Sequence, residues 1–318
     1  SKTTKMIAWR LIQLPFILFA VYTTTFLLAW QIPGNPLEKE GRRPPPEIME
    51  AMESQYNLND PVAFYSDYAW EASGLAWVFS NHKGPVFNLG PSLRHENWTV
   101  NDILIAQLPV SMTIGLCAIL IALCIGLTAG VCSAIRPGSW LDAASLGIAI
   151  IGISLPSFVI GVALLVVFAV WLQWFPISGW GTWRHLVLPS VALSLPFAAY
   201  VAQLTRAGMI EQLRSDHIRT ARAKGLPERV VVLKHALKNA FLPVLSYLGP
   251  ATAAAMTGSF VVEKVFAIPG IGTHFVDAVL GKDITVLMGI VLVYSTMLIL
   301  FNLLVDVMYR FIDPRITA

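Results

Sequence analysis

Two long apolar blocks of this chain are joined by residues 206–242, which read RAGMIEQLRSDHIRTARAKGLPERVVVLKHALKNAFL. From Arg206 to Lys238 the segment holds eight Lys or Arg and three Asp or Glu, a net charge of five positive. Basic segments between membrane spans stay on the cytoplasmic side of the membrane. Charge and periodicity leave two interpretations open: a docking element for a cytoplasmic partner, or a helix that rests on anionic lipid.

The order of residues in this segment predicts two short helices. Asp216 can cap the first helix, because its carboxylate accepts the open amide hydrogens of the following turn. Gly225 can end that helix, since glycine adopts the left-handed backbone conformation without a side-chain clash. Pro227 stands where the second helix begins, at a position that needs no amide hydrogen. Apolar residues then recur at helical spacing on the second helix: Val230, Leu233, Leu237 and Phe241.

Composition places the chain in a membrane. Hydrophobic residues make up 56% of it and charged residues only 13%, whereas a soluble domain is about 25% charged. Mean hydropathy is +0.65. Basic and aromatic residues do not cluster as they do in proteins that grip nucleic acid, so no nucleic-acid partner is expected. The three cysteines share one apolar block and form neither a metal-ligand pattern nor a disulfide framework: Cys117, Cys124 and Cys132.

Six apolar blocks can cross a bilayer, which predicts an all-α integral membrane protein with six transmembrane helices. The blocks cover residues 7–32, 103–135, 143–174, 186–204, 243–262 and 284–309. In this arrangement fourteen Lys or Arg lie inside and eight outside, so both termini are expected in the cytoplasm. A short helix is expected at 47–56, within the long polar stretch. The predicted domains are 1–32 (N-terminal end and first helix), 33–100 (external segment), 101–310 (five-helix transmembrane domain) and 311–318 (cytoplasmic tail).

Small and polar residues inside the blocks carry two interpretations. Gly126 and Gly130 form a small-xxx-small face, which allows close approach of a neighbouring helix. Pro156 frees a backbone carbonyl, and we expect an ordinary packed kink there, with an aqueous path as the alternative. Packing is also the safer interpretation for the small residues of the fifth block, although they could leave space for a passing solute. The candidates for packing or path are Ser154, Pro156, Gly249, Gly258, Asn302 and Asp306.

The string Arg219–Pro227, RTARAKGLP, resembles the coupling loop of permease subunits in ATP-binding-cassette importers. It is most similar to the branch that imports oligopeptides, dipeptides and nickel. Arg219 and Thr220 stand where the broad importer pattern has Glu and its first Ala, and His217 where the branch usually has Tyr. A second match begins at Glu263 and follows the branch's signature Glu-x-x-Phe-x-Ile-Pro-Gly-Ile-Gly. The resemblance covers nearly the whole chain.

The resemblance implies a type I importer permease fold and a set of partners. These are a second homologous permease subunit, two cytoplasmic ATPase subunits and an external substrate-binding protein, all at a bacterial or archaeal inner membrane. No enzyme activity, cofactor or metal is expected in this chain, which lacks a P-loop, so ATP and Mg would be bound by the ATPase subunits. The residues implied in coupling to the ATPase are Asp216, His217, Arg219, Thr220, Ala221, Arg222, Ala223, Lys224, Gly225 and Leu226. Those implied in an external cap or gate are Glu263, Phe266, Pro269, Gly270 and Gly272.

The expected function is therefore ATP-driven import of peptides, with this chain forming half of the translocation path. Import of nickel or another small solute stays an alternative, because much of the selection can rest with the external binding protein. A membrane enzyme is disfavoured, since the apolar blocks hold almost no converging His, Asp, Glu, Ser or Cys. A structural or channel-like membrane protein would function without ATPase subunits, so co-purification of such subunits separates it from an importer.

Overall fold

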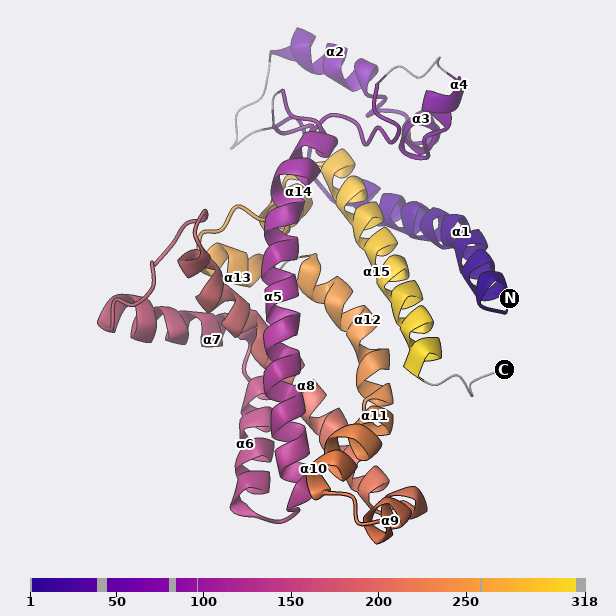
Figure 1. Ribbon diagram of the computed structural model, residues 1–318. Coiled ribbons are helices and arrows are strands. Elements are labelled where there is room, and N and C mark those ends of the chain that lie inside the picture. The colour runs from indigo at the N-terminus through magenta and orange to yellow at the C-terminus, as the bar shows by residue number, and fades with distance from the viewer. Residues whose placement is uncertain (1, 39–44, 80–83, 96, 258, 313–318) are drawn as a thin grey trace. The chain divides into compact units, whose positions relative to one another are not determined.

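The computed structural model describes residues 2–38, 45–79, 84–95, 97–257 and 259–312 (Figure 1). Within these ranges the regular structure is helical, apart from one isolated bridge between Pro91 and Thr99. The all-α prediction is confirmed. The chain divides into two compact units. The first unit comprises residues 1–4, 111–269 and 298–318, and the second comprises 5–110 and 270–297.

Four helices are long and apolar enough to cross a membrane, and six spans result if each of two bent helix pairs counts as one. The helices of the second unit, or shared by both, are α1 (Lys2–Trp30), α2 (Pro46–Gln55), α3 (Pro61–Ala72), α4 (Leu75–Phe79), α5 (Val100–Ile135), α14 (Ile271–Gly281) and α15 (Ile284–Ile312). The first unit adds α6 (Trp140–Ser154), α7 (Ser157–Leu164), η1 (Leu165–Trp171), α8 (Trp183–Leu213), α9 (Asp216–Ala223), α10 (Glu228–Val230), η2 (Val231–Ala236), α11 (Leu237–Ala240), α12 (Leu242–Met256) and α13 (Phe260–Val265).

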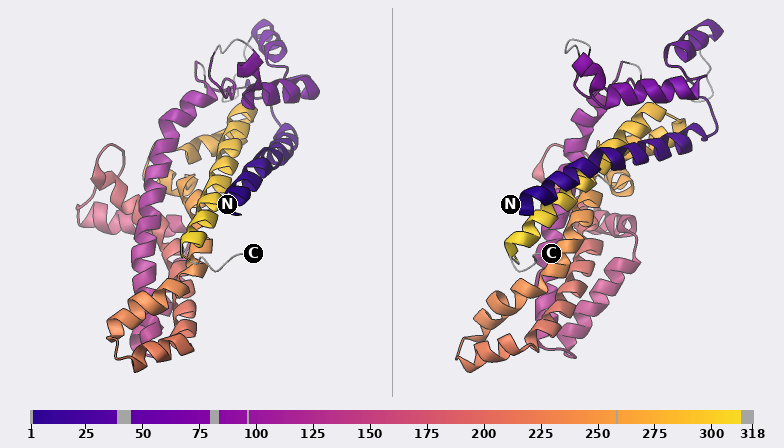
Figure 2. Two further views of the ribbon diagram at one scale, coloured as in Figure 1. Left: turned by 45° about the vertical axis from the view of Figure 1, so that its right-hand side comes forward. Right: turned by 90° about the vertical axis from the view of Figure 1, so that its right-hand side faces the viewer.

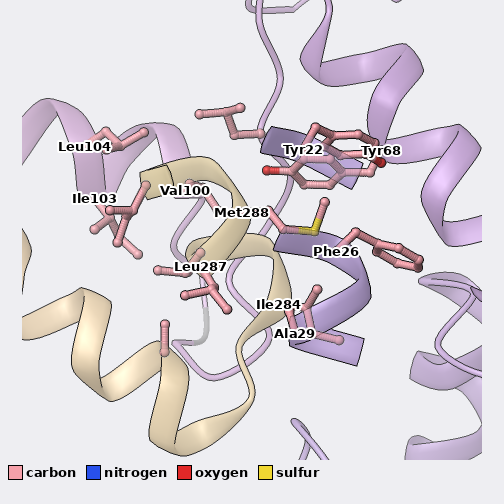
Figure 3. Close-up of a cluster of buried hydrophobic side chains, with 14 of the residues drawn as sticks. Tyr22, Phe26, Ala29, Tyr68, Val100, Ile103, Leu104, Ile284, Leu287 and Met288 are labelled. Carbon is pink, nitrogen blue, oxygen red and sulfur yellow. The ribbon is translucent and has the colours of Figure 1, made fainter. Parts of the chain in front are cut away.

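Aromatic side chains form the core of the second unit. Figure 3 shows Tyr22 and Phe26 of α1 close to Tyr68 of α3 and Met288 of α15. The Tyr22 and Tyr68 rings stack with their centroids 6.0 Å apart. The Tyr22 hydroxyl donates to the Tyr65 carbonyl oxygen at 2.5 Å, so the polar end of a buried ring is satisfied. These contacts hold part of the polar stretch 33–100 against the ends of two long helices.

One local prediction for that polar stretch can be compared with the structure. The short helix expected at 47–56 is present as α2. Helix α3 begins after Asp60, whose carboxylate accepts hydrogen bonds from the Val62 and Ala63 amides at 2.9 and 3.0 Å. Capping of this kind satisfies amide hydrogens that a helix start leaves open.

Small residues let the helices of the first unit approach closely. A Cβ added to Gly126 of α5 would lie 2.7 Å from the Ala198 carbonyl oxygen of α8. One added to Gly130 would lie 2.6 Å from the Thr205 side chain. Further along α5, a Cβ on Gly115 would overlap the backbone of α12 at Ala255. The glycines therefore occupy positions where the neighbouring backbone leaves no room for a side chain.

The third apolar block is broken rather than gently kinked. Helices α6 and α7 meet at 105°, so the expectation of an ordinary packed kink at Pro156 was wrong. Leu155 is extended, with ψ 128°, and Pro156 occupies the N-cap position of α7. Proline disfavours helical conformation in the residue before it and lacks an amide hydrogen, so it ends one helix and starts another.

The close approach at Gly126 gives a first testable prediction. Gly126→Val should destabilise the protein by about 1–3 kcal/mol or more, because the added atoms meet a backbone oxygen that cannot move alone. Gly147→Val is the matched control, since Gly147 also lies in a helix but has open space where its Cβ would be. Thermal unfolding of the purified protein in detergent measures both. Equal melting temperatures for the two variants would contradict the packing argument.

Candidate functional site

Helix α9 is the centre of the candidate coupling segment. Its N-cap lies one residue earlier than the sequence predicted. Ser215 occupies the N-cap position with extended backbone, and Asp216 is the first helical residue. The prediction that Asp216 caps the helix was wrong, because no side chain caps this start by a hydrogen bond. Oδ1 of Asp216 instead lies 3.7 Å from Nη1 of Arg219, which is one turn away on the exposed surface. Its negative charge in the first turn still favours the helix.

The end of α9 has the geometry predicted for Gly225. Its φ is +75°, in the left-handed region. The Gly225 amide donates to the Arg222 carbonyl oxygen at 2.9 Å, and the Leu226 amide to that of Ala221 at 3.4 Å. This pair of bonds is a Schellman motif, which satisfies the last carbonyls of a helix. The chain therefore leaves α9 abruptly, and Pro227 then takes the N-cap position of α10.

The two faces of α9 have different surroundings. Ile218 is fully buried and Ala221 is 6% exposed, both in one apolar cluster. The cluster, called here the anchor cluster, consists of Val131, Ala134, Met209, Ile218, Ala221, Val231, Val232, Ala236 and Ala240. Ala221, one of the residues implied in coupling, points into this cluster because it follows Ile218 by three positions on a helix. The exposed residues are Asp216, His217, Arg219, Thr220, Arg222, Ala223, Lys224, Gly225 and Leu226.

The second predicted helix is present but buries a different face. It consists of α10, the π-helical turn η2 and α11 in succession. Leu233, expected on the apolar face, is 59% exposed, whereas Val231, Val232 and Ala236 are buried. A π turn holds more residues than the α-helical period assumes. It therefore rotates the following side chains away from the face that α-helical spacing predicts.

Arg222 pairs with the second helix across the turn. Its Nη2 and Nε donate to the Glu228 carboxylate at 2.6 and 3.2 Å. These hydrogen bonds raise the pKa of Arg222. Both side chains are close to half exposed, at 44% and 57%, so the pair contributes only about 0–1 kcal/mol to stability. Its effect is to fix the direction of one guanidinium on the basic surface of α9.

Residues of the second motif fall on both sides of the boundary between the units. In the first unit, the buried Glu263 carboxylate accepts a hydrogen bond from Ser111 of α5 at 2.6 Å. Phe266 is buried, and Pro269 is exposed. In the second unit, Gly270 is the N-cap residue of α14 and Gly272 is buried in its first turn. The structure thus places this motif on two short helices and the turn between them.

The candidate packing or path residues lie in several places in the first unit. A Cβ on Gly249 of α12 would lie 2.6 Å from Oδ1 of Asn302 in α15, so these two helices approach closely at that point. Asp306 follows Asn302 by one helical turn. Ser154 and Pro156 lie exposed at the break between α6 and α7. Gly258 lies outside the described residues.

One polar cluster escaped the sequence analysis. Asp142, in the first turn of α6, is 3% exposed. Its carboxylate accepts from Nε and Nη2 of Arg206 in α8 at 2.7 and 2.9 Å. It also accepts from the Gly138 amide at 2.8 Å and from the Ser133 hydroxyl. The sequence shows only an acidic residue beside an apolar block. It does not show the partner, because Arg206 lies 64 positions away.

Comparison with known proteins identifies the family. Residues 122–318 match the family described as "Binding-protein-dependent transport system inner membrane component". The chain belongs to this family. The permease is 41% identical to the oligopeptide transport system permease protein OppB of Salmonella typhimurium, over 98% of this chain and 99% of that protein. It is 40% identical to the dipeptide transport system permease protein DppB of Bacillus subtilis, over 94% and 93% of the two chains.

Solved structures agree on the fold. The permease superposes on a chain of the MetNI methionine ABC transporter with a TM-score of 0.54 at 18% identity, covering 66% of the permease and 96% of that chain. An amino acid ABC transporter gives a TM-score of 0.51 at 17% identity. The predicted importer permease fold is confirmed. The family is a membrane component of ABC transporters, so the permease is not itself an enzyme.

The burial of Ile218 gives a second testable prediction. Ile218→Ala should lower the free energy of unfolding by about 2–5 kcal/mol, because it leaves a void in the anchor cluster. Leu226→Ala is the control, since Leu226 is 38% exposed and loses less packing. Thermal melting of the two purified variants measures the difference. A loss for Leu226→Ala as large as that for Ile218→Ala would show that the burial of Ile218 is not what holds α9.

Proposed function

We propose that this permease is a subunit of an ATP-driven peptide importer and that separate ATPase subunits act on it through α9. The observation that carries the proposal is the two-sided environment of α9. One face is fixed in the anchor cluster, while the other presents a basic surface that ends at an abrupt turn. A helix that merely rests on lipid would turn its apolar face outward, whereas Ile218 faces inward.

Peptides are the substrate class that the relatives favour. Identities of 41% and 40% to proteins named as oligopeptide and dipeptide permeases extend over nearly the full length of each. A dedicated path for nickel would need metal ligands along it. The described residues contain no group of three or more His, Cys, Asp or Glu that could hold a metal ion. We therefore favour peptides over the nickel alternative.

The proposed assembly has four kinds of component. This chain pairs with a second, homologous permease subunit, and each chain forms half of the path. Two ATPase subunits bind ATP and Mg, and a separate binding protein delivers the substrate from outside. Fourteen Lys or Arg fall on the side of α9 and eight on the other, which supports cytoplasmic termini and a cytoplasmic α9.

The proposed mechanism uses α9 as a lever. Closure of the ATPase subunits on ATP displaces α9, and the anchor cluster transmits this displacement to α8 and to the helix that leads into α12. Rocking of packed helical bodies then switches access to the path between the two faces of the membrane. Arg219, Arg222 and Lys224 supply the charged contacts to the ATPase surface, which is expected to carry complementary negative charge.

Crosslinking tests the docking role directly. Cysteine introduced at Thr220 or Ala223, both exposed, should crosslink to an ATPase subunit in intact membranes. The native cysteines must first be replaced by alanine, because Cys124 and Cys132 are also exposed. Cysteine at Ser178, on the proposed external side, is the matched control. Absence of an ATPase adduct at both α9 positions, in an otherwise active importer, would refute the docking role.

Two substitutions at Gly225, to Asp and to Asn, introduce side chains of nearly the same shape that differ in charge. Asn and Asp both tolerate the left-handed conformation, and the site has open space around it. Gly225→Asp adds a negative charge to the basic surface and should abolish peptide uptake while leaving the permease in the membrane. Gly225→Asn should retain most of the uptake. Uptake of a labelled oligopeptide by cells that express the complete importer measures both, and normal uptake by the Asp variant would count against the lever.

A further inference from the structure

The Asp142 carboxylate is bonded from three separate parts of the first unit. Arg206 of α8 binds it through two parallel N–H donors at 2.7 and 2.9 Å. Ser133 in the last turn of α5 donates a hydroxyl, and Gly138 in the turn between α5 and α6 donates its amide at 2.8 Å. A bidentate Arg–carboxylate contact fixes both distance and direction. This buried charge is therefore held at one position by donors on three elements.

Arg206 lies on α8, close to the residues of α8 that pack with α9. It lies seven residues before α8 ends at Leu213, which is about two helical turns. Met209, on the turn that follows Arg206, is fully buried in the anchor cluster together with Ile218 of α9. Figures 1 and 2 show α9, the end of α8 and the α5–α6 turn at one end of this unit. A displacement of α9 therefore moves the guanidinium of Arg206.

The α5–α6 hairpin also contacts α8 at small residues. A Cβ on Gly152 of α6 would lie 3.3 Å from the Leu195 carbonyl oxygen, and Gly130 of α5 meets Thr205 and Ala202. In a membrane, apolar surfaces gain little by facing each other rather than lipid. A directional charged contact adds to this packing, because it fixes the axial position of α8 against the hairpin.

We propose that the Asp142–Arg206 pair is a positioning contact that makes the α5–α6 hairpin follow α8 when α9 is displaced. This inference rests on the proposed lever function of α9. Because α6 leads through the break at Pro156 into α7, the pair connects the lever to α7. The pair acts by fixing one helix to another.

The test separates uptake from ATP hydrolysis in the complete importer, reconstituted in lipid vesicles with its binding protein and a labelled oligopeptide. Asp142→Asn keeps the shape of the side chain but removes the charge, and Arg206→Lys keeps the charge but removes the fork. Peptide taken up per ATP hydrolysed should fall about two- to thirty-fold, the range typical of residues that carry coupling between sites. Arg206→Lys should retain more coupling than Arg206→Gln. Arg136→Gln, an exposed charge at the same turn, should leave the ratio unchanged.

Three outcomes decide the matter. A fall in uptake per ATP with normal amounts of assembled complex supports the proposal. An unchanged ratio in assembled Asp142→Asn or Arg206→Lys overturns it, and so does a loss that only matches the loss of folded complex. If the charge variants fail to assemble, Ser133→Ala takes their place, because it removes only one neutral donor to Asp142. Peptide uptake per ATP hydrolysed is then measured for that variant. Crosslinking from Thr220 in the same vesicles reports the lever itself, so its failure is distinguished from failure of the Asp142–Arg206 contact.

Discussion

Close backbone contact at the glycines of α5 is the constraint on which the first unit depends. Gly126 and Gly130 bring α5 against α8, and Gly115 brings it against α12. Lipid tails are as apolar as the helix surfaces, so close packing and polar contacts must hold such helices together. This requirement leaves no room for long side chains at the crossings.

The candidate coupling segment is built onto this scaffold by ordinary packing. Val131 and Ala134, close to Gly130 on α5, enter the anchor cluster with Met209 of α8 and Ile218 of α9. The short helix α9 has few residues of its own to bury, and a helix of that length is not stable alone in water. Its position is therefore set by α5, α8 and the π turn η2. The same contacts leave its basic face exposed to a partner.

Local rules predicted much of the fold, and long-range contacts account for what they missed. Apolar length located the spans, and the freedom of glycine at positive φ located the end of α9 at Gly225, because both depend on neighbours in the sequence. The exposed position of Leu233 depends on a π turn, for which apolar spacing gives no signal. The sequence predicted the position of the break at Pro156 but not its angle of 105°. A proline sets where a helix ends, whereas tertiary contacts set the angle between the two helices. Asp142 and Arg206 meet only after α5, α6 and α8 have packed.

The two units use different chemistry in their cores, and this difference bears on what each can do. The second unit buries Tyr22, Phe26, Phe64 and Tyr68, whose rings interlock at centroid distances near 6 Å. Large interdigitated rings resist relative movement of the elements that carry them. The first unit brings α5 against α8 and α12 at glycines, and the Asp142–Arg206 pair adds a polar contact between α6 and α8. The second unit is therefore suited to holding a shape, whereas the first unit is suited to transmitting a displacement along its helices.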